Sequence, residues 1–329
     1  MILAGDIGGT KVNLACFEVD GQQVIQGVAG TYPSRQYATL ADIVRHFIAE
    51  HRLKVEYASF GIAGPVKRGR SQLTNLPWVV DVRELAAELG FSRAFLINDL
   101  EANAYGIAGL HPRDFAVLNE GEEGAAGNAA IISAGTGLGE AGLFWDGHRH
   151  LPLACEGGHS DFAPRTDLDV ELFRHLRAQF GHVSWERVLS GPGFFNIYKF
   201  FRDTRLADEP AWLKEEILAG DPSAIISRAG LAGKCEICVR TLDLFVTYYA
   251  AEASNLALKI MSTGGLYLGG GIAPKMIDKL KDGTFMKTFH ESGRMSGLLQ
   301  AMPVRVILND KTALIGSARL AAAQTGWIR

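Results

Sequence analysis

The 329-residue sequence predicts an α/β protein with two distantly similar halves. One observation is a repeated pattern: a strand, a turn rich in glycine and threonine, a second strand and a further turn occur near residue 2 and again near residue 130. Another is the composition, 47% hydrophobic and 21% charged residues, which is typical of a globular protein and excludes a disordered chain. The length suggests two or three domains, at roughly 100–200 residues each.

The first half is predicted to open with an antiparallel meander and not with a β-α-β unit. Strands are expected at residues 2–4, 12–19, 24–32, 57–62 and 94–97, and helices at 40–50, 81–89 and 100–108. Asp20-Gly21 is a hairpin signal between the second and third strands, and Gly90 is a helix stop.

The second half is predicted to begin with a strand, a glycine-rich turn and a second strand, followed by helices. Strands are expected at residues 129–133, 140–145, 266–268 and 304–308, and helices at 168–180, 184–189, 192–202, 239–261 and 313–324. A wide apolar stripe predicts that the helix at 239–261 is buried. Residues 120–128 are the best candidate for a boundary between the halves.

Charge and cysteine content exclude several classes of protein. There are 33 Lys+Arg against 36 Asp+Glu, whereas proteins that bind nucleic-acid backbones are usually more basic. Four cysteines are too few for a disulfide framework, and we interpret them as reduced thiols. The N-terminus lacks the basic region of a signal peptide, and no uncharged apolar run approaches the ~20 residues that span a bilayer. We therefore expect a cytoplasmic protein with no membrane or nucleic-acid partner.

A first candidate phosphate loop is Asp6-Ile7-Gly8-Gly9-Thr10, between the first two strands. Its glycines let backbone N–H groups point at an anion, and Asp6 could hold a hydrated divalent cation beside that anion. The alternative is a hairpin turn in which Asp6 bonds its own backbone. No helix follows the glycines and no Gly-Lys-Ser/Thr ending is present, which excludes a dinucleotide-binding fingerprint and a P-loop.

Two further glycine loops lie in the second half. Gly135-Thr136-Gly137 stands at the place that matches the first loop, so the pair would approach one polyphosphate from two sides. Gly269-Gly270-Gly271 follows a strand and would let a flat group, such as adenine or ribose, pass close to the backbone. For each loop the alternative is a simple turn at a strand end.

Polar residues at strand ends and in loops are candidates for ligand binding. Asn98-Asp99 precedes a helix, so Asp99 is either an N-cap or a base that accepts a proton from a substrate hydroxyl. Glu156-Gly157-Gly158-His159 has the spacing of a metal site, but two glycines argue against the helix that such a site needs. We interpret it as a loop that offers a carboxylate and an imidazole to a polar ligand.

Two other features have structural alternatives. Glu186 is expected in the first turn of a short helix, where the helix dipole alone could explain a carboxylate. Cys235 and Cys238 have zinc-like or redox-like spacing, but no second ligand pair is nearby. We interpret them as two thiols on one face of a helix.

These motifs together resemble bacterial glucokinases of the hexokinase, actin and Hsp70 ATPase superfold, over nearly the whole chain. The specific stretches are Glu-Gly-Gly-His-Ser-Asp-Phe-Ala-Pro at 156–164 and Glu-Arg-Val-Leu-Ser-Gly-Pro-Gly at 186–193. Residues 5–10, 135–139, 97–99 and 268–274 are similar to the two phosphate loops, the catalytic segment and the adenosine loop of that family.

The resemblance implies a two-lobed actin-like ATPase fold of duplicated ribonuclease H-like domains, with a cleft between the lobes. It implies a small lobe at 1–110, completed by 308–329, and a large lobe at 111–307. The implied activity is phosphorylation of the 6-hydroxyl of glucose with ATP and Mg²⁺, and the implied assembly is a homodimer. Kinases for fructose, mannose or N-acetylated amino sugars, and a non-catalytic sugar sensor, remain alternatives.

The resemblance also assigns roles to residues. Asp99 would be the general base, and the sugar would be held by Asn98, Asp99, Glu156, His159 and Glu186. ATP would be held by Asp6, Gly8, Gly9, Thr10, Gly135, Thr136, Gly137, Gly270 and Gly271. Mg²⁺ would arrive with ATP near Asp6, with no separate metal site. Lys11 and Leu76-Pro77 are similar to the related sugar kinase and repressor group, but the Cys-rich zinc motif of that group is absent.

Overall fold

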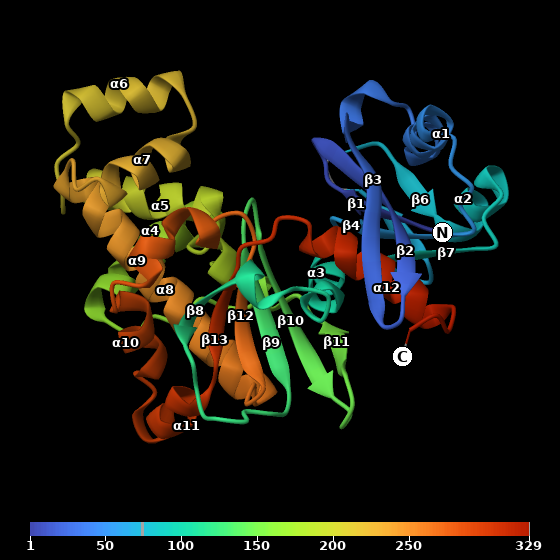
Figure 1. The fold of residues 1–329 in the computed structure, drawn as a ribbon. Helices are drawn as coiled ribbons and strands as arrows, with labels where there is room; N and C mark the ends of the chain where they lie inside the picture. Colours follow the sequence, from blue (N-terminus) through green and yellow to red (C-terminus); the bar gives the residue numbers. More distant parts are fainter. Residues whose placement is uncertain (74–75, 329) are drawn as a thin grey trace. The chain divides into compact units, whose positions relative to one another are not determined.

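The computed structural model describes residues 1–73 and 76–328 and contains two compact units. Unit 1 comprises Met1–Asp114, Arg149–Ala154 and Asn309–Arg329, and unit 2 comprises Phe115–His148 and Cys155–Leu308. Thr74, Asn75 and Arg329, the last residue of the predicted C-terminal segment, lie outside the described residues. Figure 1 labels the elements of both units.

Unit 1 is a mixed sheet with strand order β3-β2-β1-β4-β7 and helices packed on it (Figure 1). The strands of this sheet are β1 (Ile2–Ile7), β2 (Lys11–Asp20), β3 (Gln23–Pro33), β4 (Tyr57–Ile62) and β7 (Arg93–Asn98). β1, β2 and β3 pair antiparallel, which confirms the predicted meander, and β1, β4 and β7 pair parallel. Its other strands are β5 (Arg70–Gln72), β6 (Val79–Asp81) and β11 (His150–Ala154).

The helices of unit 1 begin and end at residues with clear local causes. They are α1 (Leu40–His51), α2 (Val82–Leu89), α3 (Asp99–Ile107) and α12 (Thr312–Gln324). A capping box between Thr39 and Asp42 begins α1, and the Asp81 side chain accepts the Arg83 N–H to begin α2. Gly90, with φ of 73°, ends α2 as predicted.

The strands of unit 2 follow one another in the order β10-β9-β12-β13-β8, and its helices supply most of its core. Its strands are β8 (Phe115–Asn119), β9 (Ala129–Ala134), β10 (Leu138–Trp145), β12 (Gly265–Gly269) and β13 (Val304–Ile307). Its helices are α4 (Asp167–Phe180), α5 (Gly191–Asp203), α6 (Ala211–Ala219), α7 (Pro222–Leu231), α8 (Glu236–Ile260), α9 (Ile277–Leu280), α10 (Thr284–His290) and α11 (Ser296–Ala301). The predicted buried helix is α8, whose Phe245, Tyr249 and Ala253 are fully buried.

Short 3₁₀ helices complete the two units. They cover Ser34–Gln36, Pro112–Asp114, Gly157–His159, Trp185–Arg187, Ala273–Met276 and Gly293–Met295. The helix expected at 184–189 is therefore only one 3₁₀ turn. The Trp185 N–H donates to the Ser160 carbonyl, and the Ser190 side chain caps α5, so the segment is held by contacts that compete with an α-helix.

Several elements were not predicted from the sequence, among them β8, β11, α6 and α7. β8 is five residues long and is recognisable mainly through its antiparallel pairing with β13. Within residues 1–73 and 76–328, none of the helices has the length and apolar character needed to span a membrane.

Candidate functional site

In unit 1, the first phosphate loop and Asp99 lie at the same edge of the sheet. Ile7, the last residue of β1, pairs with Ile62 of β4, and Ile62 pairs with Asn98 of β7, all in parallel register. Two inter-strand spacings of about 4.8 Å therefore place the ends of β1 and β7 about 10 Å apart. This edge can present backbone N–H groups and a carboxylate to the same ligand.

The first phosphate loop is a tight turn with its own hydrogen bonds. The Gly8 N–H donates to the Lys11 carbonyl over 3.0 Å, and the Ser34 hydroxyl donates to the Gly8 carbonyl over 2.9 Å. Asp6 is half-buried, and its Oδ2 accepts a hydrogen bond of 3.1 Å from Asn13. Burial raises the pKa of Asp6, while Asn13 and Lys11 oppose that rise. A cation beside this carboxylate would offset the cost of its burial.

The structure shows which of Asn98 and Asp99 caps α3. The N-cap of α3 is Asn98, whose Oδ1 accepts the Leu100 N–H over 2.8 Å, so Asp99 is the first helical residue and not the cap. Asp99 Oδ1 also lies 2.9 Å from the Leu100 nitrogen. Asn98 donates its amide to the Gly64 carbonyl over 3.1 Å, which ties this segment to the loop after β4.

α3 is pressed close to the sheet and to α12. A Cβ added at Gly61 of β4 would lie 2.8 Å from the Ala102 Cβ, and one added at Gly316 of α12 would overlap the Ala102 carbonyl. These close approaches fix the first turn of α3, and therefore the Asp99 backbone, against β4.

In unit 2, the second phosphate loop and the predicted adenosine loop meet. Gly135 to Gly137 form the turn between the antiparallel strands β9 and β10, and the Gly135 N–H donates to the Gly137 carbonyl over 2.9 Å. The Ile272 N–H donates to the Ala134 carbonyl over 3.3 Å. Gly270 has φ of 80°, and a Cβ there would overlap the Ala134 carbonyl, so only glycine allows this approach.

A pocket of about 730 Å³ opens beside these two loops. Its lining includes Thr136, Pro192, Ser223, Ile272 and Lys275. The lining is mainly apolar with a few polar groups, which is the usual character of a cofactor pocket. Its size and its contact with a phosphate loop suit a nucleotide.

The residues at the start of α7 that line this pocket were not predicted from the sequence. Asp221 caps α7, and the Ser223 hydroxyl donates to the Gly191 carbonyl over 2.7 Å, which joins the starts of α7 and α5. The signal was available as Gly220-Asp221-Pro222, an N-cap followed by proline at the first helical position.

The structure brings three of the predicted sugar residues, Glu156, His159 and Glu186, into neighbouring turns of unit 2. Glu156 and His159 are exposed and flank a 3₁₀ turn, where the sequence led us to expect a loop. His159 Nδ1 lies 4.0 Å from Oε1 of the half-buried Glu186. Glu186 Oε2 accepts the Leu138 N–H over 3.0 Å, just after the second phosphate loop. The sugar residues and the phosphate loop are therefore adjacent within one unit.

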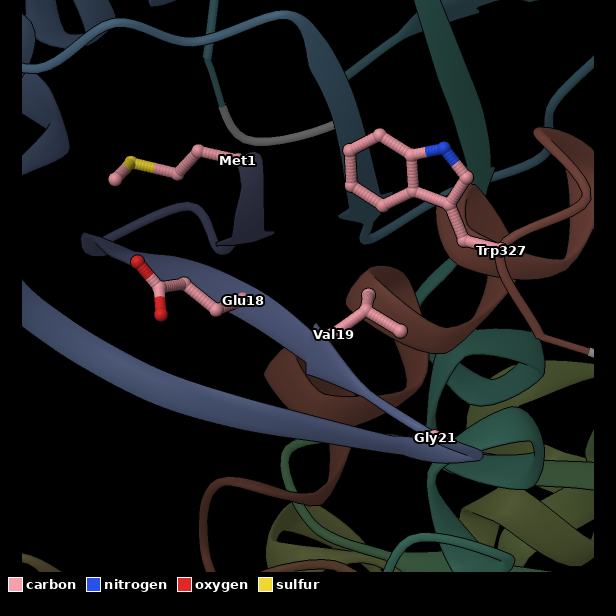
Figure 2. Close-up of a pocket in the computed structure, with 5 residues that line it drawn as sticks. All are labelled: Met1, Glu18, Val19, Gly21 and Trp327. Atoms are coloured by element: carbon pink, nitrogen blue, oxygen red, sulfur yellow. The ribbon is translucent and has the colours of Figure 1, made fainter.

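A second pocket, in unit 1, contains none of the predicted residues. Figure 2 shows its lining residues Met1, Glu18, Val19, Gly21 and Trp327, in a volume of about 560 Å³. It lies at the Gly21 end of β2, whereas the first phosphate loop is at the opposite end of that strand. Its position gives it no part in a phosphate site.

The two cysteines at the start of α8 differ in exposure. Cys235 is the half-buried N-cap and Cys238 is fully buried in the first turn. Burial raises the pKa of the Cys238 thiol, which keeps it neutral and unreactive. Among residues 1–73 and 76–328, no group of three or more His, Cys, Asp or Glu side chains could hold a metal ion.

Comparisons with known proteins agree on one family. The glucokinase family model matches residues 3–324. A glucokinase of Trichormus variabilis is 40% identical over 338 aligned positions, which cover 98% of this chain and 99% of that protein. A glucokinase structure from an Antarctic psychrotroph has a TM-score of 0.86 at 33% identity and covers 98% of both chains.

A more distant structure shows the same fold. The ROK family glucokinase of Streptomyces griseus, solved in complex with glucose and AMPPNP, has a TM-score of 0.64 at 20% identity, covering 98% of this chain and 99% of that one. The fold is the actin-like ATPase fold that these sugar kinases share. The match along the whole length and the identity to curated relatives place this chain in the glucokinase family.

Proposed function

We propose that this protein transfers the γ-phosphoryl group of ATP to the 6-hydroxyl of glucose. The observation that carries the proposal is the 3.0 Å hydrogen bond from the Leu138 N–H to Glu186 Oε2, because it joins a sugar-binding carboxylate to a phosphate loop. Family membership supports the reaction, and the complex of the Streptomyces griseus protein with glucose and AMPPNP supports the two ligands.

The nucleotide would lie mainly on unit 2. Its adenosine part would occupy the pocket beside Gly270 and Gly271, and its phosphates would approach the N–H groups of Gly135, Thr136 and Gly137. Thr136 is exposed and its hydroxyl is a further donor. The loop Gly8, Gly9 and Thr10 of unit 1 would bind the phosphates as well.

Magnesium fits the residues present near the first loop. Asp6 is a half-buried carboxylate, and its Oδ2 accepts a hydrogen bond from the Asn13 amide. Carboxylate oxygen is the ligand that Mg²⁺ prefers, usually with water in its other positions. When bound with ATP, Mg²⁺ would supply positive charge that neutralises part of the charge of the phosphates.

Five polar side chains would carry out sugar recognition and proton transfer. Glu156, His159 and Glu186 would accept or donate hydrogen bonds at ring hydroxyls, and Asn98 would do the same from unit 1. Asp99 would accept the proton of the 6-hydroxyl. Asp99 is the first residue of α3, and a carboxylate positioned there suits a loose phosphoryl-transfer transition state, in which positioning and charge matter most.

The test is an assay of ATP consumption with glucose, fructose, mannose, N-acetylglucosamine and N-acetylmannosamine. We expect glucose to have the highest kcat/KM and glucose 6-phosphate to be the product. A higher kcat/KM for another hexose would change the substrate. Sugar binding without turnover would support a sugar sensor instead.

The same preparation can test assembly and metal use. We also propose that the protein is cytoplasmic and forms a homodimer, and sedimentation analysis would test the homodimer. Activity should disappear with EDTA and return with excess Mg²⁺. Activity that persists in EDTA would refute the role given to Mg²⁺ and Asp6.

A further inference from the structure

Two buried glutamates lie beside the turn that carries Glu156 and His159. Glu140 of β10 is 2% exposed and Glu252 of α8 is fully buried. The side chains of Glu140 and Glu252 interact electrostatically, and Oε1 of each is buried with no hydrogen-bond partner among the described residues. Burying a carboxyl group costs free energy unless the group is paired or hydrogen-bonded. The reaction proposed above uses neither of these glutamates.

The surroundings decide which glutamate keeps a proton. The Asn255 amide donates to Glu252 Oε2 over 2.8 Å, and Lys259 Nζ lies 3.6 Å from Glu252 Oε1. Both contacts favour the ionised form of Glu252. Two adjacent buried carboxylates cannot both ionise cheaply, so the neutral partner is Glu140.

The Lys259 cation opposes the rise in the pKa of Glu140 but offsets only part of it. The Cys155 thiol donates to the Glu140 carbonyl over 3.2 Å, and burial raises the pKa of that thiol. Glu156 adds negative charge beside Cys155, and β9 (Ala129–Ala134) has no charged side chain. Burial first, and the Glu252 charge second, raise the pKa of Glu140 to about 8.

Glu140 is in direct contact with the sugar-binding turn. A Cβ added at Gly157 would overlap Glu140 Oε2, and one added at Gly158 would overlap the Leu138 carbonyl. The turn therefore rests on β10 through backbone atoms, and Gly157 lies on the Glu140 carboxyl itself. Any movement of that carboxyl must move Gly157 and its neighbour Glu156.

We propose that Glu140 is a positioning residue for sugar binding: its neutral carboxyl, paired with Glu252, supports Gly157 and holds Glu156 and His159 in place. Loss of the proton would leave two carboxylates in contact, push them apart and displace the turn. The proposal rests on the proposed function, since it takes residues 156–159 as the sugar-binding turn. Glucose affinity should then fall as the pH rises through about 8.

The test is calorimetric titration of the full-length protein with glucose from about pH 7 to about pH 9.5. If sugar binding raises the pKa of Glu140 by one unit, wild-type affinity falls on the order of tenfold across this range. Glu140→Gln keeps a neutral donor toward Glu252, so its affinity should stay constant across this pH range. Glu171→Gln, an exposed residue of α4, is the matched control and should follow the wild type.

A second variant tests the pairing without replacing either buried glutamate. Lys259 is 59% exposed, so Lys259→Gln should fold even if Glu140→Gln does not. Without the nearby cation, two carboxylate charges are harder to hold, and the pH midpoint of the affinity loss should move upward. If Glu140 only filled space beside the turn, Lys259→Gln would leave this midpoint unchanged.

The outcomes separate this proposal from the proposed function. No glucose binding at pH 7 would refute the proposed function. Glucose binding that is constant with pH in the wild type would overturn only the role of Glu140. The same is true if Glu140→Gln loses affinity with pH as the wild type does, or if Lys259→Gln leaves the midpoint unchanged.

Discussion

Replacing Glu186 by alanine should weaken sugar binding. Its carboxylate has two neighbours: Oε2 accepts the Leu138 N–H over 3.0 Å, and Oε1 lies 4.0 Å from His159 Nδ1. The side chain is 31% exposed, so Oε1 remains open to a sugar hydroxyl. The substitution removes a charged hydrogen-bond acceptor and leaves the N–H of Leu138 without it.

The expected size follows from these contacts. A hydrogen bond to a charged group contributes about 1.5–3 kcal/mol, so loss of one to the sugar lowers kcat/KM for glucose about 10- to 150-fold. The KM for ATP should rise as well, by a smaller factor, because Leu138 follows the second phosphate loop directly. Glu186→Gln keeps an acceptor of the same shape and should recover part of the loss.

The assay measures glucose 6-phosphate through NADP⁺ reduction by an added dehydrogenase. Glu171→Ala, an exposed glutamate of α4 in the same unit, serves as the control and should behave as the wild type. If Glu186→Ala keeps a kcat/KM for glucose within twofold of the wild type, Glu186 does not bind the sugar.

Three other changes test separate parts of the site. Asp99→Asn should lower kcat about 10²–10⁴-fold while glucose still binds in calorimetry; a variant with half the wild-type kcat would show that Asp99 is no base. Gly270→Ala should raise the KM for ATP and lower the melting temperature, because φ of 80° and the Ala134 carbonyl exclude a Cβ; unchanged values of both would contradict this. Glu140→Gln should become more stable relative to the wild type between pH 4.5 and about 8, because a raised folded-state pKa means that wild-type stability is lost as the pH rises. The slope has an upper limit of about 1.4 kcal/mol per pH unit, and equal denaturation curves throughout this range would argue against a buried proton.

Local sequence signals predicted much of the framework. The meander of unit 1 follows from alternating strands and Asp20-Gly21, and Gly90 ends α2 in the left-handed conformation that favours glycine. The glycine loops at 8–10 and 135–137 were predicted as turns between strands, and both join antiparallel strands. These features depend on neighbours in the chain, which a sequence displays directly.

Features set by distant contacts were harder to predict. The one-turn helix at Trp185–Arg187 depends on a hydrogen bond from the Trp185 N–H to the Ser160 carbonyl. No local sequence pattern predicts this hydrogen bond. Glu140 follows Gly139 in a strand and resembles an ordinary exposed glutamate, yet it is buried against Glu252, more than a hundred residues away. Its partner is visible only when α8 is placed beside the sheet.

Close backbone contacts join the predicted ligand loops of unit 2 to one another. A Cβ at Gly137 would lie 2.6 Å from Glu186 Oε2, one at Gly158 would overlap the Leu138 carbonyl, and one at Gly270 would overlap the Ala134 carbonyl. Each glycine thus brings a different loop against the turn between β9 and β10. Because interiors packed this closely transmit small displacements, a shift of that turn moves the proposed phosphate, adenosine and sugar contacts together. Changes in KM for glucose and for ATP should therefore be coupled whenever this turn is altered, even though the two ligands use different side chains.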